Sequence, residues 1–192
     1  MIFETIITTL NADGSVHIAP MGIRQVKDLI VIAPFKPSTT LDNIKRNNQA
    51  VVNLTDDVRI FAGCLTGRYD WPTVPATLIS GQRLGNTLSH MELVVKTIEE
   101  DQRRPRFLCE VRHQAMHQPF KGFNRAQAAV LEAAILTSRL HMLPAEKVDT
   151  ELEYLEIAIE KTAGPVEQEA WSWLMERIDD FRRQQAASKG MV

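Results

Sequence analysis

A polar turn in the first quarter of the chain carries the residue types best suited to chemistry. Lys36, Ser38, Thr39 and Thr40 come directly before a short amphipathic pattern over residues 41–47. The first N–H groups of a helix have no acceptor within the helix, and the helix dipole favours negative charge there. Hydroxyl groups, these N–H groups and a lysine at a helix start can bind a phosphate. The alternative is that the hydroxyls only cap the helix, with Thr39 or Thr40 as the capping residue.

The turn must be positioned by the strands on either side of it. Residues 29–35 form an almost unbroken apolar run, which is typical of a buried strand, and residues 51–54 are predicted as the next strand. Asn53 is the one polar residue in that second strand. Upstream, residues 2–10 are rich in isoleucine and threonine, and Asp13-Gly14 predicts a hairpin into a strand that starts at Val16.

That hairpin's second strand contains the sequence Ala19-Pro20-Met21-Gly22. Proline cannot donate to a strand ladder and glycine weakens one, so we expect this strand to be bulged or to lie at an edge there. Backbone groups left out of the ladder could contact a planar ligand. A plain strand irregularity is the alternative.

Further strands are predicted over residues 59–65, 88–98 and 106–111, with a loop over residues 68–75 that either covers a ligand or packs on a barrel end. Frequent turns and a single helix after the third strand indicate a small β-barrel that ends near Gln118. Three helices follow, the first beginning with a capping-box pattern at Asn124 and Gln127 and ending near Met142. The next two meet at Gly164-Pro165, and the chain is expected to fray from Gln184. The sequence therefore predicts an α+β protein with a barrel domain over 1–118 and a three-helix region over 119–192.

The composition of the chain narrows the classes of partner and location that are expected for the protein. A net charge of -2 gives no reason to expect nucleic acid or an anionic membrane as a partner. No apolar run reaches the roughly 20 residues that span a bilayer, and the first ten residues lack a basic leader, so a cytoplasmic protein is expected. Cys64 and Cys109 share no metal-ligand spacing and are expected to be buried thiols.

The familiar catalytic motifs are missing from the sequence. It contains no GxSxG, P-loop or GxGxxG pattern. His113 and His117 are four residues apart, but this region begins as a strand and runs into Pro119, so no metal site is predicted. His17 and His90 are interpreted as hydrogen-bonded strand residues.

Two segments resemble a known family. HIAPMGI, followed by PFKPSTTLDNIKRNNQAVVNLTDD, is similar to the FMN-binding split-barrel (flavin reductase-like) proteins. The resemblance is to the branch found in methanogenic archaea and in bacteria with tetrahydromethanopterin-linked metabolism, and GFNRAQAAVLEAAILTSRL resembles the start of that branch's helical region. It implies a split barrel with a helical C-terminal appendage, a homodimer, and FMN as the cofactor near the dimer interface.

The resemblance also implies which residues would bind the cofactor. The phosphate would be held by the hydroxyl-rich turn and the helix after it, with Lys36 as a further partner, and the ring system would lie along the Pro-Met-Gly strand. Asn53 would reach the ribityl chain or the ring. The implied residues are Ala19, Pro20, Met21, Gly22, Lys36, Ser38, Thr39, Thr40, Asn43 and Asn53.

Two functions are consistent with this reading. One is an FMN-dependent oxidoreductase acting on a small metabolite, linked by the resemblance to tetrahydromethanopterin synthesis; the flavin would carry the hydride, so no nucleophile is needed. The other is a non-catalytic flavin-binding assembly or sensing protein, suggested by the large helical region.

Overall fold

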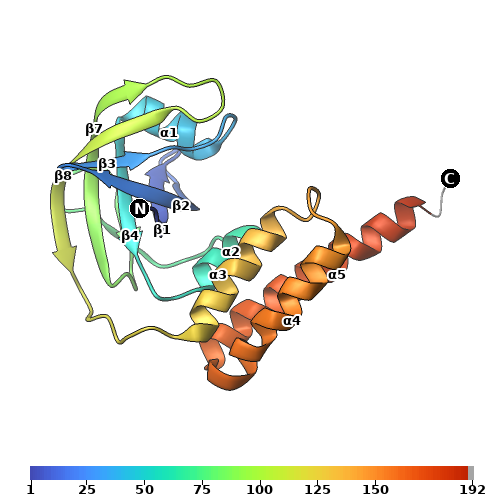
Figure 1. The fold of residues 1–192 in the computed structure, drawn as a ribbon. Coiled ribbons are helices and arrows are strands. Elements are labelled where there is room, and N and C mark those ends of the chain that lie inside the picture. Colours follow the sequence, from blue (N-terminus) through green and yellow to red (C-terminus); the bar gives the residue numbers. More distant parts are fainter. Residues whose placement is uncertain (190–192) are drawn as a thin grey trace. The chain divides into compact units, whose positions relative to one another are not determined.

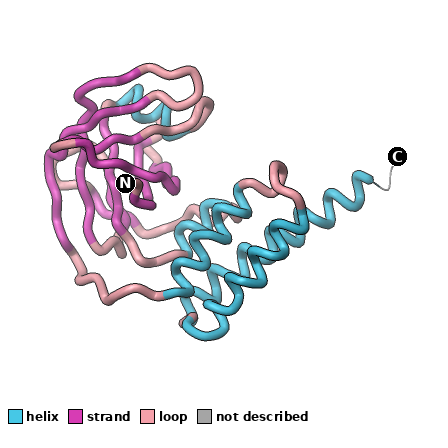
Figure 2. Tube along the Cα trace, in the orientation of Figure 1, coloured by secondary structure: helices cyan, strands magenta, loops and turns pink. Residues whose placement is uncertain are grey.

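The structure, a computed structural model, describes residues 1–189 and divides into two compact units (Figure 1). The barrel unit comprises residues 1–56 and 70–120. The helical unit comprises residues 57–69 and the described residues from 121 onward. Figure 2 shows the strands in the first unit and mostly helices in the second. This division differs from consecutive domains over 1–118 and 119–192, because residues 57–69 belong with the helices.

Six antiparallel strands close the barrel in the order β1-β2-β3-β8-β7-β4, and β4 pairs with β1 to complete the ring. Apolar residues alternate along these strands, so one face of each packs into a shared core that includes Ile7, Ile32 and Phe107. The strands are β1 (Phe3–Leu10), β2 (Val16–Val26), β3 (Leu29–Ile32), β4 (Gln49–Leu54), β7 (Ser89–Glu99) and β8 (Arg106–Met116).

Helix α1 (Thr39–Asn47) packs on the barrel through its buried Leu41 and Ile44. Polar side chains on the same face fix its position. Thr40 Oγ1 lies 3.1 Å from Nε2 of His17 on β2. Asn43 Nδ2 donates to Thr9 Oγ1 at 3.0 Å and to Asn11 Oδ1 at 2.8 Å. The start of α1 is thereby tied to the hairpin formed by β1 and β2.

A second sheet made of β5 (Thr73–Pro75) and β6 (Gln82–Leu84) contacts β1 and β4. Asn53 joins these layers. Its Oδ1 accepts the backbone N–H of Leu84 at 2.7 Å, and its Nδ2 donates to the carbonyl of Ile6 and to Thr8 Oγ1, both at 3.2 Å. Thr8 in turn donates to the carbonyl of Gln82. This hairpin was not predicted, because residues 68–75 were interpreted as a loop.

The connection between β5 and β6 is held by a buried carboxylate. Glu92 on β7 accepts the backbone N–H groups of Thr77, Leu78 and Ile79. Burial alone raises the pKa of this carboxyl, but the three N–H groups and the His90 ring together outweigh burial, so the pKa lies below its ordinary value. Glu92 therefore acts as an ionised anchor for residues 77–79.

The helical unit contains α2 (Arg59–Leu65), α3 (Arg125–Ser138), α4 (Ala145–Thr162) and α5 (Pro165–Lys189). The prediction of a strand over residues 59–65 is wrong. Ala62 is fully buried in a core that it shares with the alanines of α3, and such close helix contacts need small side chains. Arg59 holds the start of α2 through ion pairs with Asp57 and Glu169. Packing in three dimensions thus overrides the strand-like composition.

The helix ends of this unit follow the predictions in part. Asn124 caps α3, its Oδ1 accepting the N–H of Ala126 at 2.7 Å. The predicted capping box does not form, since Gln127 donates to Glu167 on α5 instead. Helix α3 ends at Ser138 rather than near Met142, and α5 continues through Gln184 to Lys189.

Two further expectations concern the two cysteines and the possibility of a membrane-spanning segment. Cys109 is buried and Cys64 is half-buried, and burial raises the pKa of each thiol to about 12. Both thiols are therefore poor nucleophiles at neutral pH. None of the helices within residues 1–189 is long and apolar enough to cross a membrane.

The bonds of Asn53 predict a large effect on stability. Replacement Asn53→Ala leaves the buried N–H of Leu84 without its acceptor, and we expect the free energy of unfolding to fall by about 2–4 kcal/mol. Urea unfolding followed by circular dichroism measures this loss. Asn86→Ala, at an exposed turn position, is the matched control. Equal stability of the two variants would show that Asn53 does not join the layers.

The half-buried ring of His17 predicts that folding stability depends on pH. Burial lowers the pKa of His17, so below about pH 6.5 the unfolded chain takes up a proton more readily than the folded chain. Folding stability therefore falls as the pH drops from 6.5 toward the folded pKa, and above about pH 6.5 His17 has no such effect. Urea unfolding at about pH 7.5 and 5.5 should show a smaller acid loss for His17→Gln than for the unaltered protein. The exposed-residue variant His141→Gln should keep the full loss.

Candidate functional site

Ser38, rather than Thr39 or Thr40, caps helix α1. Its backbone is extended, with φ of −160°, and its Oγ accepts the N–H of Leu41 at 3.3 Å. The predicted helix is therefore present, but its cap is one residue earlier than expected. The physical reason is that Thr40 is needed elsewhere, because its hydroxyl is turned inward against His17.

The polar residues of the turn thus divide into two groups. Thr40 and Asn43 are buried and bonded to the barrel, so they position the helix. Ser38 is half-buried and Thr39 is exposed. The N–H groups of Thr39 and Thr40 lie in the first turn, where no acceptor exists within the helix. The exposed Asp42 in the same turn opposes anion binding, but solvent screens its charge.

Lys36 lies on the approach to this helix and is held by the connection between β7 and β8. Its Nζ donates to the carbonyl of Asp101 at 2.8 Å and pairs with Glu100 at 3.4 Å. Its N–H donates to the carbonyl of Arg103. Arg104 donates to the carbonyl of Ala33. Lys36 therefore adds positive charge near the turn, although Glu100 partly offsets it.

The Ala19–Gly22 segment faces an interruption in the ladder between β2 and β3. These strands pair only from Ile23 opposite Ile32 to Val26 opposite Leu29. On its other side β2 pairs with β1 in continuous register from Val16 to Ile23, without a bulge. Of the two alternatives predicted for this strand, the edge is thus confirmed and the bulge is not.

The interruption has a defined end on each side. Ile23 pairs with Ile32 at one end, and His17 meets Thr40 at the other. Between them, residues 33–38 connect the end of β3 to α1, while residues 19–22 pair with β1 and lie outside the ladder between β2 and β3. The start of α1 therefore lies beside His17, at one end of the Ala19–Gly22 segment, whereas Lys36 is directed toward the connection between β7 and β8. Asn53 lies on β4, with its amide bonded to β1 and β6.

Other candidate residues have structural roles. His17 and His90 are hydrogen-bonded strand residues, as predicted. Arg104 lies over the ring of Phe35, 4.2 Å from its centroid, so this arginine supports the approach to α1. In the predicted loop over residues 68–75, Arg68 belongs to the helical unit and stacks on Trp173 at 4.5 Å. The contacts of Arg104 with Ala33 and Phe35 were not predicted from the sequence, because only the tertiary structure brings these residues together.

Solved structures resemble this fold. An FMN-bound protein of the DUF447 family from Methanosarcina mazei superposes with a TM-score of 0.79 at 18% identity, covering 92% of this chain and 94% of that one. The 2-nitrobenzoate 2-nitroreductase of Pseudomonas fluorescens gives 0.51 at 23% identity, covering 59% and 64%. Flavoredoxin of Methanosarcina acetivorans gives 0.52 at 14%, covering 59% and 68%. The predicted α+β fold, a flavin reductase-like split barrel with C-terminal helices, is confirmed.

Sequence comparison agrees with the structural one. No curated protein matches the chain in sequence. Residues 3–118 match a family model described as the N-terminal domain of a protein of unknown function (DUF447), and residues 124–176 match a second model described as a protein of unknown function (DUF447). Because the first match alone spans more than half of the chain, the protein belongs to the DUF447 family.

Proposed function

We propose that this protein is an FMN-binding flavoprotein whose cofactor lies at the interrupted ladder between β2 and β3. The observation that carries the proposal is the position of the α1 start beside this interruption. The start of α1 supplies helix N–H groups and hydroxyls, and the interruption supplies a stretch of strand that pairs on one side only. The FMN-bound relative in the same family, similar over 92% of this chain, supports the same cofactor.

The residues at the α1 start fit the phosphate of FMN. Thr39 offers an exposed hydroxyl and Ser38 a half-buried one, and the first-turn N–H groups add backbone donors. Lys36 can supply a positive charge by exchanging its exposed contact with Glu100 for the phosphate. Thr40 and Asn43 would act indirectly, by holding the helix in place.

The Ala19–Gly22 segment fits the flavin ring. Four strand residues extend about 10 Å, which is comparable to the length of a three-ring system. These residues are half-buried and have small or unbranched side chains. Because β3 does not pair with them, their backbone groups on the β3 side lie outside the ladder. Asn53 is not part of this proposed site, because its amide is fully engaged in joining the barrel to β6.

The flavin would make the protein an oxidoreductase for a small metabolite. Bound FMN supplies hydride transfer, and the protein's residues bind it, orient it and limit the access of water. The sequence resemblance makes reduced pterins related to tetrahydromethanopterin the first substrates to test. We also propose a homodimer, to be checked by the molecular mass in analytical ultracentrifugation.

A second candidate function is a non-catalytic flavin-binding protein that uses its helices for assembly. The observation in its favour is the independent core of the helical unit, which includes Ala133, Trp171 and Leu174. The two functions differ in one measurable property. An oxidoreductase flavin is reduced by a nicotinamide donor or by substrate, whereas a purely structural flavin is not.

Flavin binding is tested by titrating the protein with FMN and following flavin fluorescence. We expect binding of one FMN per chain and release of FMN on denaturation. Thr39→Val removes a hydroxyl that would donate to the phosphate, so affinity should fall about 10–100-fold, or about 1.5–3 kcal/mol. Thr150→Val, an exposed threonine on α4, is the matched control. Unchanged affinity in Thr39→Val would remove the turn from the site.

Reduction of the bound flavin separates the two functions. We expect NADH or NADPH, or a reduced pterin, to bleach the flavin absorbance under anaerobic conditions within the time of catalytic turnover. Dithionite serves as a control that the flavin can be reduced chemically. A flavin that dithionite reduces, but that resists every biological donor, would favour the non-catalytic function.

A further inference from the structure

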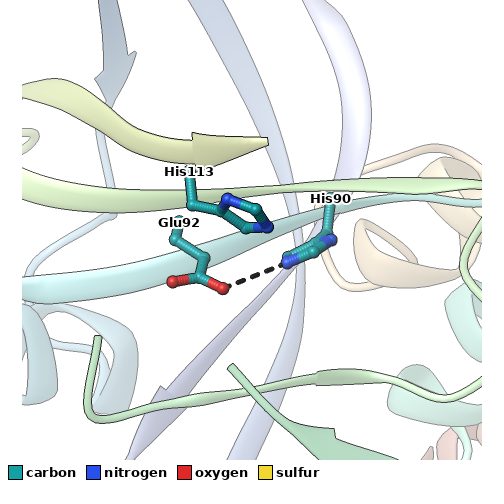
Figure 3. A group of neighbouring side chains, drawn as sticks. All are labelled: His90, Glu92 and His113. Atoms are coloured by element: carbon teal, nitrogen blue, oxygen red, sulfur yellow. Dashed lines mark hydrogen bonds and ion pairs between the residues drawn. The ribbon is translucent and has the colours of Figure 1, made fainter. Parts of the chain in front are cut away.

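Three side chains of the barrel unit converge outside the proposed flavin site. Figure 3 shows a carboxylate oxygen of Glu92 and a ring nitrogen of each of His90 and His113 directed toward one another. These three atoms all lie within 4.8 Å of one another. Two imidazole nitrogens and one carboxylate oxygen form a donor set that suits a divalent first-row transition metal.

Strand register brings the three residues together. His90 and Glu92 are two residues apart on β7, so their side chains point to the same face, opposite to Met91 and Leu93 of the core. On β8 the register shifts between the pairs Leu93–Val111 and Glu92–His113. Without this bulge Glu92 would lie opposite Arg112, and His113 would take the opposite face. The bulge therefore places His113 beside Glu92.

The spacing of the donor atoms is close to that of a metal site. His90 Nε2 and Glu92 Oε1 are 3.2 Å apart, and in a tetrahedral zinc site ligand atoms are about 3.2–3.6 Å apart, given bonds of about 2.0–2.2 Å. His90 and Glu92 are almost completely buried, with 1% and 0% of their surface exposed. His113 is half-buried, so its ring can rotate to complete the set.

Outer contacts orient two of the three donors. The N–H groups of Leu78 and Ile79 donate to Glu92 Oε2, and the N–H of Thr77 donates to Oε1, so that Oε1 is held facing His90. On the other side of His90, Nδ1 lies 2.9 Å from Nε2 of His117, and the two rings stack. Metal-binding histidines usually have a hydrogen-bond partner at the second ring nitrogen, and His117 supplies it here.

We propose that His90, Glu92 and His113 bind a single divalent transition-metal ion, with Zn²⁺ as the reference cation, and that His117 orients His90. On binding, the ion bonds to Nε2 of His90, and that ring carries its proton on Nδ1, from where it donates to His117. Three protein donors leave the remaining coordination position to a solvent molecule. This site is not expected from the sequence, where the His113–His117 spacing predicts no metal site and the His-x-Glu pattern lies on a strand.

The full-length protein tests this proposal after treatment with EDTA and buffer exchange. Titration with ZnCl₂ by isothermal calorimetry should show one ion bound per chain, and MgCl₂ should give no binding, because Mg²⁺ prefers oxygen donors. Substitution with Co²⁺ should give a visible absorption band from nitrogen and oxygen ligands. Zinc at about 100-fold above its Kd should raise Tm by roughly 5–10 °C.

Variants identify the ligands. His113→Asn is the main test, since this half-buried residue is the one least needed for folding, and zinc affinity should fall at least about 100-fold. His117→Asn should lower affinity about 10–100-fold, as expected for an outer partner. His141→Asn, an exposed histidine in the helical unit, should bind zinc normally.

The outcomes that overturn the proposal are distinct. The first is an unaltered protein that binds no zinc. The second is a folded His113→Asn variant, checked by circular dichroism, that binds zinc as tightly as the unaltered protein. The third is equal loss of binding in His113→Asn and His141→Asn. None of these readouts depends on flavin, so the result is independent of the proposed function.

Discussion

The short pairing between β2 and β3 is the constraint on which the barrel depends. Four residue pairs, from Ile23–Ile32 to Val26–Leu29, close the ring on this side. Beyond them the chain leaves the ladder, and its backbone groups need other partners. Ser38 caps the following helix, Arg104 bonds to Ala33, and Thr40 reaches His17. The location of the proposed flavin site is therefore a consequence of how the barrel closes.

Buried polar side chains secure the opposite part of the barrel. Asn53 and Glu92 lie on the faces of β4 and β7 that point away from the apolar core, beneath residues 77–84. A buried polar group without a partner costs about 1–3 kcal/mol, so each of these side chains requires the backbone groups that it binds. Their burial makes the covering segment and the barrel depend on each other. The amide of Asn53 is thereby used to join two layers of the barrel unit.

The same principle separates side chains that hold a helix or strand in place from side chains that remain exposed to solvent. Thr39 and Thr40 are adjacent and chemically alike, but one hydroxyl is exposed and the other is buried against His17. Likewise, His113 and His117 are alike in sequence, and strand register gives them different neighbours: His113 faces Glu92, whereas His117 stacks on His90. Chemical type gives the possible roles of a side chain, and its surroundings select among them.

The sequence by itself determined the alternating strands, the helix after the third strand, and the polar turn that begins it, because these depend on local periodicity and capping. It also indicated the open edge at Pro20. Only tertiary structure decided that residues 59–65 are helical, since Ala62 packs among the alanines of α3. Only it decided that Asn53 joins two sheets and that His113 lies beside Glu92. Such roles arise from contacts between residues distant in sequence, and local patterns carry no information about which distant residues will meet.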